Sequence, residues 1–215
     1  MEPADGSADR RDLLYGLHAV REALKSGARP LQRIMVLRVD RQFADVVRIA
    51  KTKDIPVRIE PAAAFDRLIP HGKHQGIIAF VAAKTYSTTE EILDRARLRG
   101  EAPFVVLLDG VEDPHNLGAV LRTAEAAGVH GVFIPERRAV GLTSVVAKVS
   151  AGAIDHMLVG RVGNLTHLIA ELKKQGLWVY GVEPSAPDGY MTLDLTGPIA
   201  LVVGGEGEGI RPGVL

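Results

Sequence analysis

Four runs rich in Val, Ile and Leu in the second half of the chain constrain its fold more than any other feature. The runs fall at residues 104–108, 131–134, 177–182 and 199–203. Amphipathic segments at 116–127 and 165–175, each followed by a glycine, lie between them. Strands that are apolar throughout are typical of a parallel sheet with helices on both faces. The pattern therefore predicts an α/β domain with a parallel sheet over residues 101–215.

The first half shows the same alternation on a smaller scale. Strand-like runs lie at residues 34–37, 55–59 and 77–81, with helical patterns between them. They predict a small α/β domain over residues 13–83. Residues 1–12 are polar and are expected to form a disordered tail. The charged stretch 84–100 is interpreted as a linker, with the boundary near residue 85, in which Thr88 or Thr89 could cap a short helix bearing Ile92 and Leu93.

Charge is distributed unevenly between the two halves. Residues 1–100 hold 18 Lys and Arg against 13 Asp and Glu, a balance of +5, and residues 101–215 hold 8 against 13, a balance of −5. The basic half indicates an anionic partner, or else a solvated surface with unevenly placed charges. The absence of cysteine excludes disulfides and thiolate metal sites. No apolar run approaches the roughly 20 residues that span a bilayer, and no signal peptide is evident, so a cytoplasmic protein without membrane contact is expected.

The segment 108–125 carries the first candidate site. A buried strand ends at Asp109, and open α/β sheets place their sites at such ends. Asn116 is placed to cap the following helix, and Gly118 permits close backbone approach. Arg122, still near the positive end of the helix, suits a phosphate or an ionising hydroxyl. The alternative is that Arg122 pairs with Glu125 on a solvated face.

A glycine-rich loop over residues 202–210 carries the second candidate site. Glycines after a buried strand let backbone amides approach a ligand closely. Glu206 and Glu208 would repel a pyrophosphate, so a ligand without phosphate fits better, such as S-adenosylmethionine with its sulfonium. The alternative is a tight turn with exposed carboxylates.

Two further segments are weaker candidates. Ser150, at the end of a helical stretch, could present a hydroxyl to a phosphate, or it could be an ordinary helix terminus. His71 and His74 flank a basic turn that lacks nearby carboxylates, so no metal site is expected there.

Taken together, these segments resemble the SpoU (TrmH-type) family of RNA 2′-O-methyltransferases. The first family motif is matched by residues 113–118 and 122–125, and the second by residues 201–209. Residues 15–24 and 74–77 resemble the start and end of a ribosomal-protein-like RNA-binding domain. That domain occurs in the branch that methylates a guanosine of large-subunit ribosomal RNA. The family's third motif, rich in Ser and Asn, is not matched before Leu215, so the methyltransferase domain is expected to be C-terminally incomplete.

The resemblance implies a fold, a cofactor and roles for particular residues. Residues 13–83 would form the RNA substrate-binding domain, and residues 101–215 a knotted SPOUT-type methyltransferase domain that dimerises and builds its active site from both subunits. The cofactor would be S-adenosylmethionine, and the partner ribosomal RNA. The implied catalytic residues are Arg122, Asn116 and Glu206. The implied cofactor-binding residues are Gly204, Gly205, Val203 and Val182. The implied RNA-binding residues are Ser150, Arg21 and His18.

Arg122 could act in two ways in this reaction. A free guanidinium, with a pKa above about 12, is a poor base, which favours electrostatic stabilisation of the forming alkoxide. A role as base requires a large shift of its pKa. Other functions also fit the sequence: a non-catalytic RNA-binding protein, a transfer-RNA methyltransferase, or a nucleotide-dependent oxidoreductase that uses the glycine loop.

Overall fold

The computed structural model describes residues 11–27, 29–70 and 73–214, and these form two compact units. One unit comprises Met1–Thr85 and Leu142–His156, and the other comprises Tyr86–Gly141 and Met157–Leu215. Each unit is thus built from two stretches of sequence. His71 lies outside the described residues, as do residues 1–10 of the expected tail.

The first unit contains a four-stranded sheet in the order β1-β4-β2-β3. Its strands are β1 (Arg11–Tyr15), β2 (Leu31–Val36), β3 (Val57–Ile59) and β4 (Ile77–Ala82). Its helices are α1 (Leu17–Ser26), α2 (Ala44–Thr52) and α3 (Ala62–Leu68). β4 pairs antiparallel with β1 and β2, whereas β2 and β3 are parallel. The sheet is therefore mixed, with one parallel pair, β2 and β3, which the chain joins through the crossover helix α2.

Two short helices from the middle of the chain complete this unit. They are α6 (Ser144–Val149), which contacts β1, and α7 (Ala153–His156), which contacts α1. A buried ion pair joins Arg29 to α7, with Nε of Arg29 2.7 Å from Oδ1 of Asp155. The sequence pattern placed these residues in the domain 101–215, whereas the structure groups them with the first unit, because their partners lie there.

The second unit contains a five-stranded sheet in the order β7-β6-β5-β9-β8. Its strands are β5 (Phe104–Asp109), β6 (Gly131–Pro135), β7 (Leu158–Val162), β8 (Trp178–Val182) and β9 (Ile199–Gly204). All four pairings are parallel, as the apolar runs predict. β5 lies at the centre, next to β9, although 90 residues separate them in sequence. The carboxyl ends of β5 and β9 are therefore neighbours.

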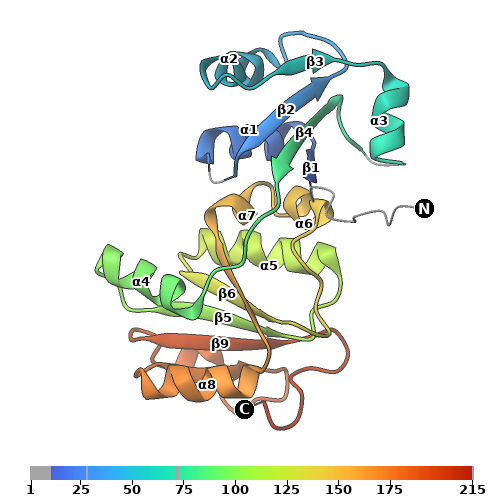
Figure 1. Ribbon diagram of the computed structural model, residues 1–215. Coiled ribbons are helices and arrows are strands. Elements are labelled where there is room, and N and C mark those ends of the chain that lie inside the picture. Colours follow the sequence, from blue (N-terminus) through green and yellow to red (C-terminus); the bar gives the residue numbers. More distant parts are fainter. Residues whose placement is uncertain (1–10, 28, 71–72, 215) are drawn as a thin grey trace, which may run out of the picture. The chain divides into compact units, whose positions relative to one another are not determined.

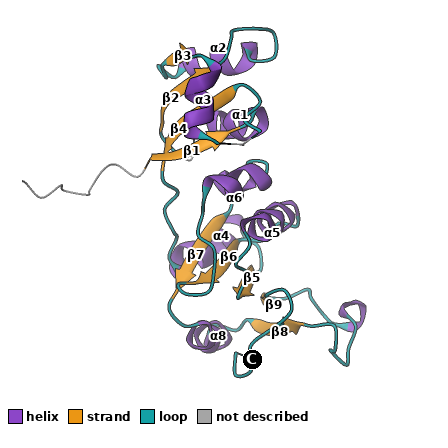
Figure 2. Cartoon of the chain, turned by 90° about the vertical axis from the view of Figure 1, so that its right-hand side faces the viewer, coloured by secondary structure: helices purple, strands orange, loops and turns teal. Residues whose placement is uncertain are grey.

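Helices cover both faces of this sheet. They are α4 (Thr89–Arg99), α5 (Pro114–Ala126) and α8 (Leu165–Lys174). Figures 1 and 2 show α5 on one face and α8 on the other. Side chains of α4 and α8 share one buried cluster with Val105, Phe133 and Val202 of the strands. None of the described helices is long and apolar enough to cross a bilayer.

The stretch 84–100, expected to be a linker, contains helix α4 packed into this core. Thr88 and Glu91 form a capping box at its start, which satisfies amides that would otherwise lack partners. Ile92 and Leu93 are buried, and Gly131 leaves room for Ile92 because a Cβ there would lie 2.5 Å from that side chain. The buried face of α4 consists of only three residues, Ile92, Leu93 and Ala96, and the many charges around them are typical of a linker.

Candidate active site

The candidate site lies where β5 and β9 end side by side. Asp109, the last residue of β5, is opposite Gly204, the last residue of β9. After β5 the chain turns into α5, whose first turn is capped by Asp113 through a 2.7 Å bond from the amide of His115. Proline at the first helical position needs no amide partner. This local sequence places Asn116 in the first turn, facing the end of the sheet.

The loop after β9 is a narrow turn that only glycines allow. A Cβ on Gly204 would lie 2.0 Å from the carbonyl carbon of Gly209, and one on Gly205 would lie 2.3 Å from the oxygen of Gly110. The amide of Gly209 donates to the oxygen of Gly205 at 3.2 Å and closes the turn. Glu206 consequently sits near the tip of the loop, exposed to solvent.

Asn116 and Glu206 meet at this site. Nδ2 of Asn116 donates to Oε1 of Glu206, and it lies 3.5 Å from Oδ2 of Asp113. The contact joins residues 90 positions apart and brings together the two segments that the sequence singled out. An amide hydrogen bond to one carboxylate oxygen leaves the other oxygen of Glu206 as an acceptor.

Beneath this contact a buried carboxylate anchors the loop. Asp109 is only 1% exposed, and its Oδ1 lies 2.8 Å from Nε and 2.6 Å from Nη2 of Arg211. Its Oδ2 accepts the backbone amide of Arg211 at 2.9 Å. The hydrogen bond that the Arg211 side chain donates to Asp109 raises the pKa of Arg211 above its ordinary value. Burial of a charge without such partners would cost several kcal/mol, roughly.

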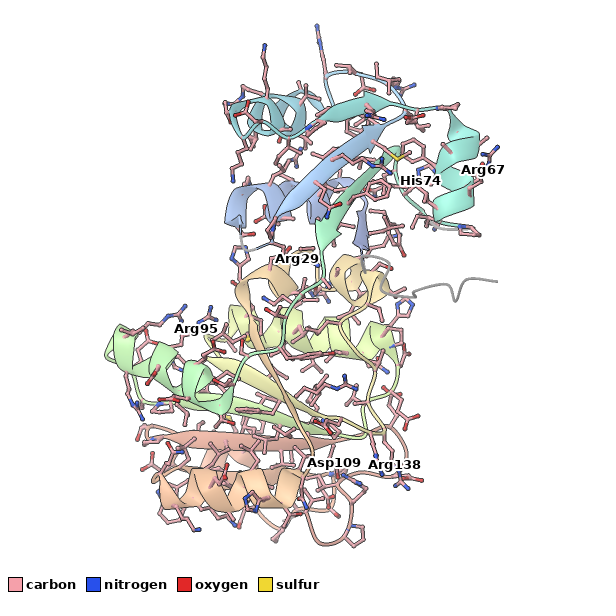
Figure 3. The ribbon with its side chains drawn as sticks, viewed as in Figure 1. Arg29, Arg67, His74, Arg95, Asp109 and Arg138 are labelled. Carbon is pink, nitrogen blue, oxygen red and sulfur yellow. The ribbon has the colours of Figure 1, made fainter. Side chains whose placement is uncertain are left out.

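A polar cavity of about 330 Å³ opens beside the Asn116–Glu206 contact. It is lined by Asp109, Gly110, Glu112, Asp113, Arg138, Gly205, Glu206, Glu208, Gly209 and Arg211. Figure 3 shows Asp109 and Arg138 at the same end of the sheet. Because acids outnumber arginines, the cavity favours a neutral or cationic group over a pyrophosphate.

A second, mainly apolar cavity of about 460 Å³ lies against β8 and β9. It is lined by side chains of β8 and β9, among them Tyr180, Val182 and Leu201, and by the segment 183–195. Glu183 borders this cavity and its Oε1 accepts the amide of Ile210 at 3.0 Å. Val203, predicted to contact a cofactor, pairs with Val182 in the sheet. A cavity of this size and polarity suits a flat, mostly apolar ligand group.

Arg122 does not lie with the other predicted catalytic residues. It is exposed on α5, six positions after Asn116, and so points about 120° away around the helix. It does not line the polar cavity, and within the described residues its side chain has neither an ion pair nor a hydrogen bond. The alternative pairing with Glu125 is likewise not formed.

The predicted RNA-binding residues differ in their exposure to solvent and in their partners within the chain. His18 is exposed on α1. Arg21 is bound to Asp45, with its Nε 2.6 Å from Oδ2. Ser150 is fully buried, its hydroxyl donating to the oxygen of Ala147 at 3.1 Å, so the single chain presents no Ser150 hydroxyl to a phosphate.

Sequence reasoning missed four residues of this site. Asp109 was noted only as a strand end, and Arg211, Arg138 and Glu183 were not singled out. Arg138 has a φ of 57°, which is uncommon for a residue other than glycine, but nothing in the sequence indicates it. The one available signal was Asp109, a charged residue directly after five apolar ones.

Two family models match the chain, and together they cover most of it. Residues 103–215 match the SpoU rRNA Methylase family, and residues 13–87 match a domain described as RNA 2′-O ribose methyltransferase substrate binding. Among curated proteins, the Bacillus subtilis protein named "Putative TrmH family tRNA/rRNA methyltransferase YacO" is 42% identical over 205 residues, which are 94% of this chain and 82% of that protein.

Solved structures share the fold. The SpoU methyltransferase AviRb of Streptomyces viridochromogenes, in complex with AdoMet, matches with a TM-score of 0.76 and 20% identity, over 95% of this chain and 77% of that one. An AdoMet-bound rRNA methyltransferase of Sinorhizobium meliloti matches with a TM-score of 0.72 and 22% identity, over 94% and 73%. At these identities the similarity establishes the fold: a substrate-binding domain followed by a parallel-sheet methyltransferase domain.

Proposed function

This chain belongs to the SpoU rRNA Methylase family, and we propose on that premise that it methylates the 2′-hydroxyl of a ribose in RNA, with S-adenosylmethionine as methyl donor. We further propose that the target is a guanosine of large-subunit ribosomal RNA. The observation that carries the proposal is the contact between Asn116 and Glu206. It joins the two family motifs at the carboxyl ends of adjacent strands, where α/β sheets hold their ligands.

The apolar cavity and the glycine loop fit the proposed cofactor. The apolar cavity with Val182 and Leu201 suits the adenosyl group. Backbone groups of Val203, Gly204 and Gly205 would hold it, and nearby carboxylates favour its positive charge. When bound, S-adenosylmethionine would supply a methyl group that an attacking oxygen displaces in line from the sulfonium. AviRb, which shares the fold, is known in complex with AdoMet.

The protein's own task in this reaction is to stabilise the ribose oxygen as it loses its proton. Asn116 and Glu206 supply a hydrogen-bonded pair that would orient the hydroxyl. Arg122 would stabilise the developing negative charge, since a guanidinium is a poor base.

The exposed position of Arg122 favours a homodimer. Its side chain is exposed and is not among the residues that line the polar cavity. In a two-fold dimer the same surface is used twice, so each Arg122 would reach the site of the other copy. We propose this shared site, together with a knotted methyltransferase domain, as the family membership implies.

The first unit would hold the RNA. It matches the substrate-binding model over residues 13–87, and His18 is exposed on α1. The basic balance of residues 1–100 suits phosphate contacts, which weaken as salt rises. Arg21 and Ser150 remain proposed RNA contacts only if binding frees Arg21 from Asp45 and exposes Ser150.

Methyl transfer from tritiated S-adenosylmethionine tests the proposal directly. The full-length chain is incubated with unmodified large-subunit ribosomal RNA and, in parallel, with unmodified transfer RNA. Labelled RNA is digested with alkali, which cannot cleave the linkage after a 2′-O-methylated ribose. We expect alkali-resistant label at one guanosine of the ribosomal RNA.

Each other outcome has a distinct meaning. Label confined to transfer RNA would contradict the proposed substrate but keep the reaction. Label in alkali-sensitive nucleotides would place the methyl on a base and overturn ribose specificity. RNA binding without any label, by a chain that also fails to bind S-adenosylmethionine, would favour a non-catalytic RNA-binding protein.

A further inference from the structure

Asp109 is the most deeply buried acid of the second unit, and all of its partners come from one residue. Its carboxylate lies within 2.9 Å of three nitrogens of Arg211: Nε, Nη2 and the backbone amide. Asp109 ends β5, and Arg211 follows the glycine loop, 102 positions later. The pair therefore ties the far end of the loop to the centre of the sheet. We call it the Asp109–Arg211 clamp.

A second carboxylate holds the neighbouring backbone amide. Oε1 of Glu183, just after β8, accepts the amide of Ile210 at 3.0 Å. Two successive amides are thus bound by acids from the ends of two different strands. The near end of the loop is held by pairing of Gly204 with Asp109 in the sheet. The five residues 205–209 are consequently fixed at both ends.

The loop needs such external ties because of its own composition. Four of the six residues 204–209 are glycine, the residue that loses most conformational freedom on folding. The bond between Asn116 and Glu206 joins side chains that water can reach, so it does not order the loop on its own. The charge-assisted Asp109–Arg211 pair, whose carboxylate is buried, is stronger and less screened.

We propose that Asp109 and Arg211 are positioning residues for the methyl-transfer reaction. The clamp fixes the position of the glycine loop relative to the sheet, and thereby holds Glu206 against Asn116 at the polar cavity that the loop lines. Neither residue exchanges a proton or a methyl group. The assignment rests on the proposed function for its catalytic consequence, but its effect on the loop is independent of that function.

The test compares Arg211→Met with Arg97→Met in the full-length chain. Arg211 is partly exposed, so its methionine variant keeps the apolar stem and should fold. Arg97 forms an exposed ion pair with Asp94 on α4 at 2.5 Å and is the matched control for loss of an Arg–Asp pair within the same unit. Arg211→Lys retains the positive charge but not the planar guanidinium. Asp109→Asn removes the negative charge of the other residue of the clamp.

Two readouts separate positioning from mere stability. Hydrogen exchange of peptide 204–211 should accelerate in Arg211→Met while the strands keep their protection. The kcat should fall by up to about 100-fold, as small misplacements of a reacting group do, with an unchanged KM for RNA. Arg211→Lys should recover part of kcat, and Arg97→Met should match the wild type.

Wild-type-like exchange and kcat in Arg211→Met would overturn the proposal. So would a lower Tm with unchanged kcat per folded molecule, because the clamp would then be structural only. If the wild type transfers no methyl group, the proposed function fails, yet the exchange data still decide whether the clamp orders the loop.

Discussion

A hydrogen bond between solvent-accessible side chains such as Asn116 and Glu206 contributes only about 0.5–1.5 kcal/mol to folding. Its importance is geometric, since it orients Glu206 and leaves the second carboxylate oxygen able to accept a hydrogen bond from a hydroxyl group. Loss of the contact should therefore affect the reaction far more than it affects stability.

We predict that Asn116→Ala lowers kcat by about 100-fold, the usual effect of removing one preorganised hydrogen bond at a reacting centre. Affinity for S-adenosylmethionine should not change, because Asn116 is not among the residues that line the apolar cavity. The measurement is single-turnover methyl transfer together with calorimetric titration of the cofactor. His115→Ala, at an exposed neighbouring position, is the control. Full activity of Asn116→Ala would remove its assigned role.

At the same scale, Arg21 has a structural role that competes with RNA binding. Its hydrogen bond to Asp45 lowers the pKa of that carboxyl. A lowered folded-state pKa stabilises the protein above the unfolded pKa of about 3.9, and this gain disappears as the pH falls through the folded pKa. The pair therefore contributes at neutral pH and not in strong acid.

We predict that Arg21→Met lowers stability at pH 7 and that its difference from the wild type shrinks below about pH 4. Urea unfolding across this pH range measures the effect. RNA affinity should fall little, since the guanidinium is already committed to Asp45. A large loss of RNA affinity with unchanged stability would instead make Arg21 a direct RNA contact.

At the scale of elements, close approach between α4 and β6 depends on glycine. A Cβ on Gly131 would lie 2.5 Å from Cγ2 of Ile92, too close for any real pair of carbons. All five residues of β6 are buried, so packed atoms surround the strand and its backbone has little room to move.

We predict that Gly131→Ala destabilises the chain by about 1–3 kcal/mol, the usual cost of overpacking, as measured by urea unfolding. In an Ile92→Ala background the same substitution should cost less, because Cγ1, Cγ2 and Cδ1 of Ile92, the atoms nearest the added Cβ, are then absent. Gly197→Ala, where a Cβ would meet nothing within 4 Å, serves as the control. Additive effects of the two substitutions would contradict the packing described.

The helix α7 is held by a different kind of contact. Asp155 and Arg29 have side chains only 1% and 4% exposed, so their ion pair is shielded from water and salt. Removing one member of a buried pair leaves the other charge in a poorly solvated place.

We predict that Asp155→Asn lowers the free energy of unfolding by about 3–5 kcal/mol, in denaturant titrations at constant salt. Asp94→Asn, at an exposed pair with Arg97, should change it by less than about 1 kcal/mol. Similar small effects of both substitutions would show that the buried pair contributes no more than the exposed one.

At the scale of the whole molecule, the proposed dimer makes a prediction about mixtures. Arg122→Ala and Asn116→Ala should each lose most of the activity alone, but a refolded equimolar mixture should regain about a quarter of wild-type activity, because half the dimers then hold one intact site. Methyl transfer before and after mixing measures this. No recovery, in a mixture shown to contain heterodimers, would place Arg122 and Asn116 in the same copy's site.

Much of the architecture was predictable because it depends on local patterns. The continuous apolar runs predict the parallel strands β5, β6, β8 and β9, and the glycines after helices predict where α5 and α8 end. The segments around Asn116 and Glu206 were also found, since unusual residues followed buried strands in both. A short helix bearing Ile92 and Leu93 was predictable within the stretch 84–100, but its packing into the core was not. Six of the eleven residues of α4 are charged, which suggests a linker, and only Ile92, Leu93 and Ala96 are buried.

What only the tertiary structure decided is which distant residues meet. Strand order put β9 beside β5, and this register alone brings Glu206 to Asn116 and Arg211 to Asp109, across 90 and 102 positions. The fold also leaves Arg122 exposed on α5, outside the lining of the polar cavity, and groups residues 142–156 with the first unit. The period of the apolar residues indicates which face of an element is buried. It does not indicate which other element covers that face, because packing is set by the summed contacts of the whole chain. The sequence by itself therefore determined the elements and the two motifs, and the fold decided the site that they form.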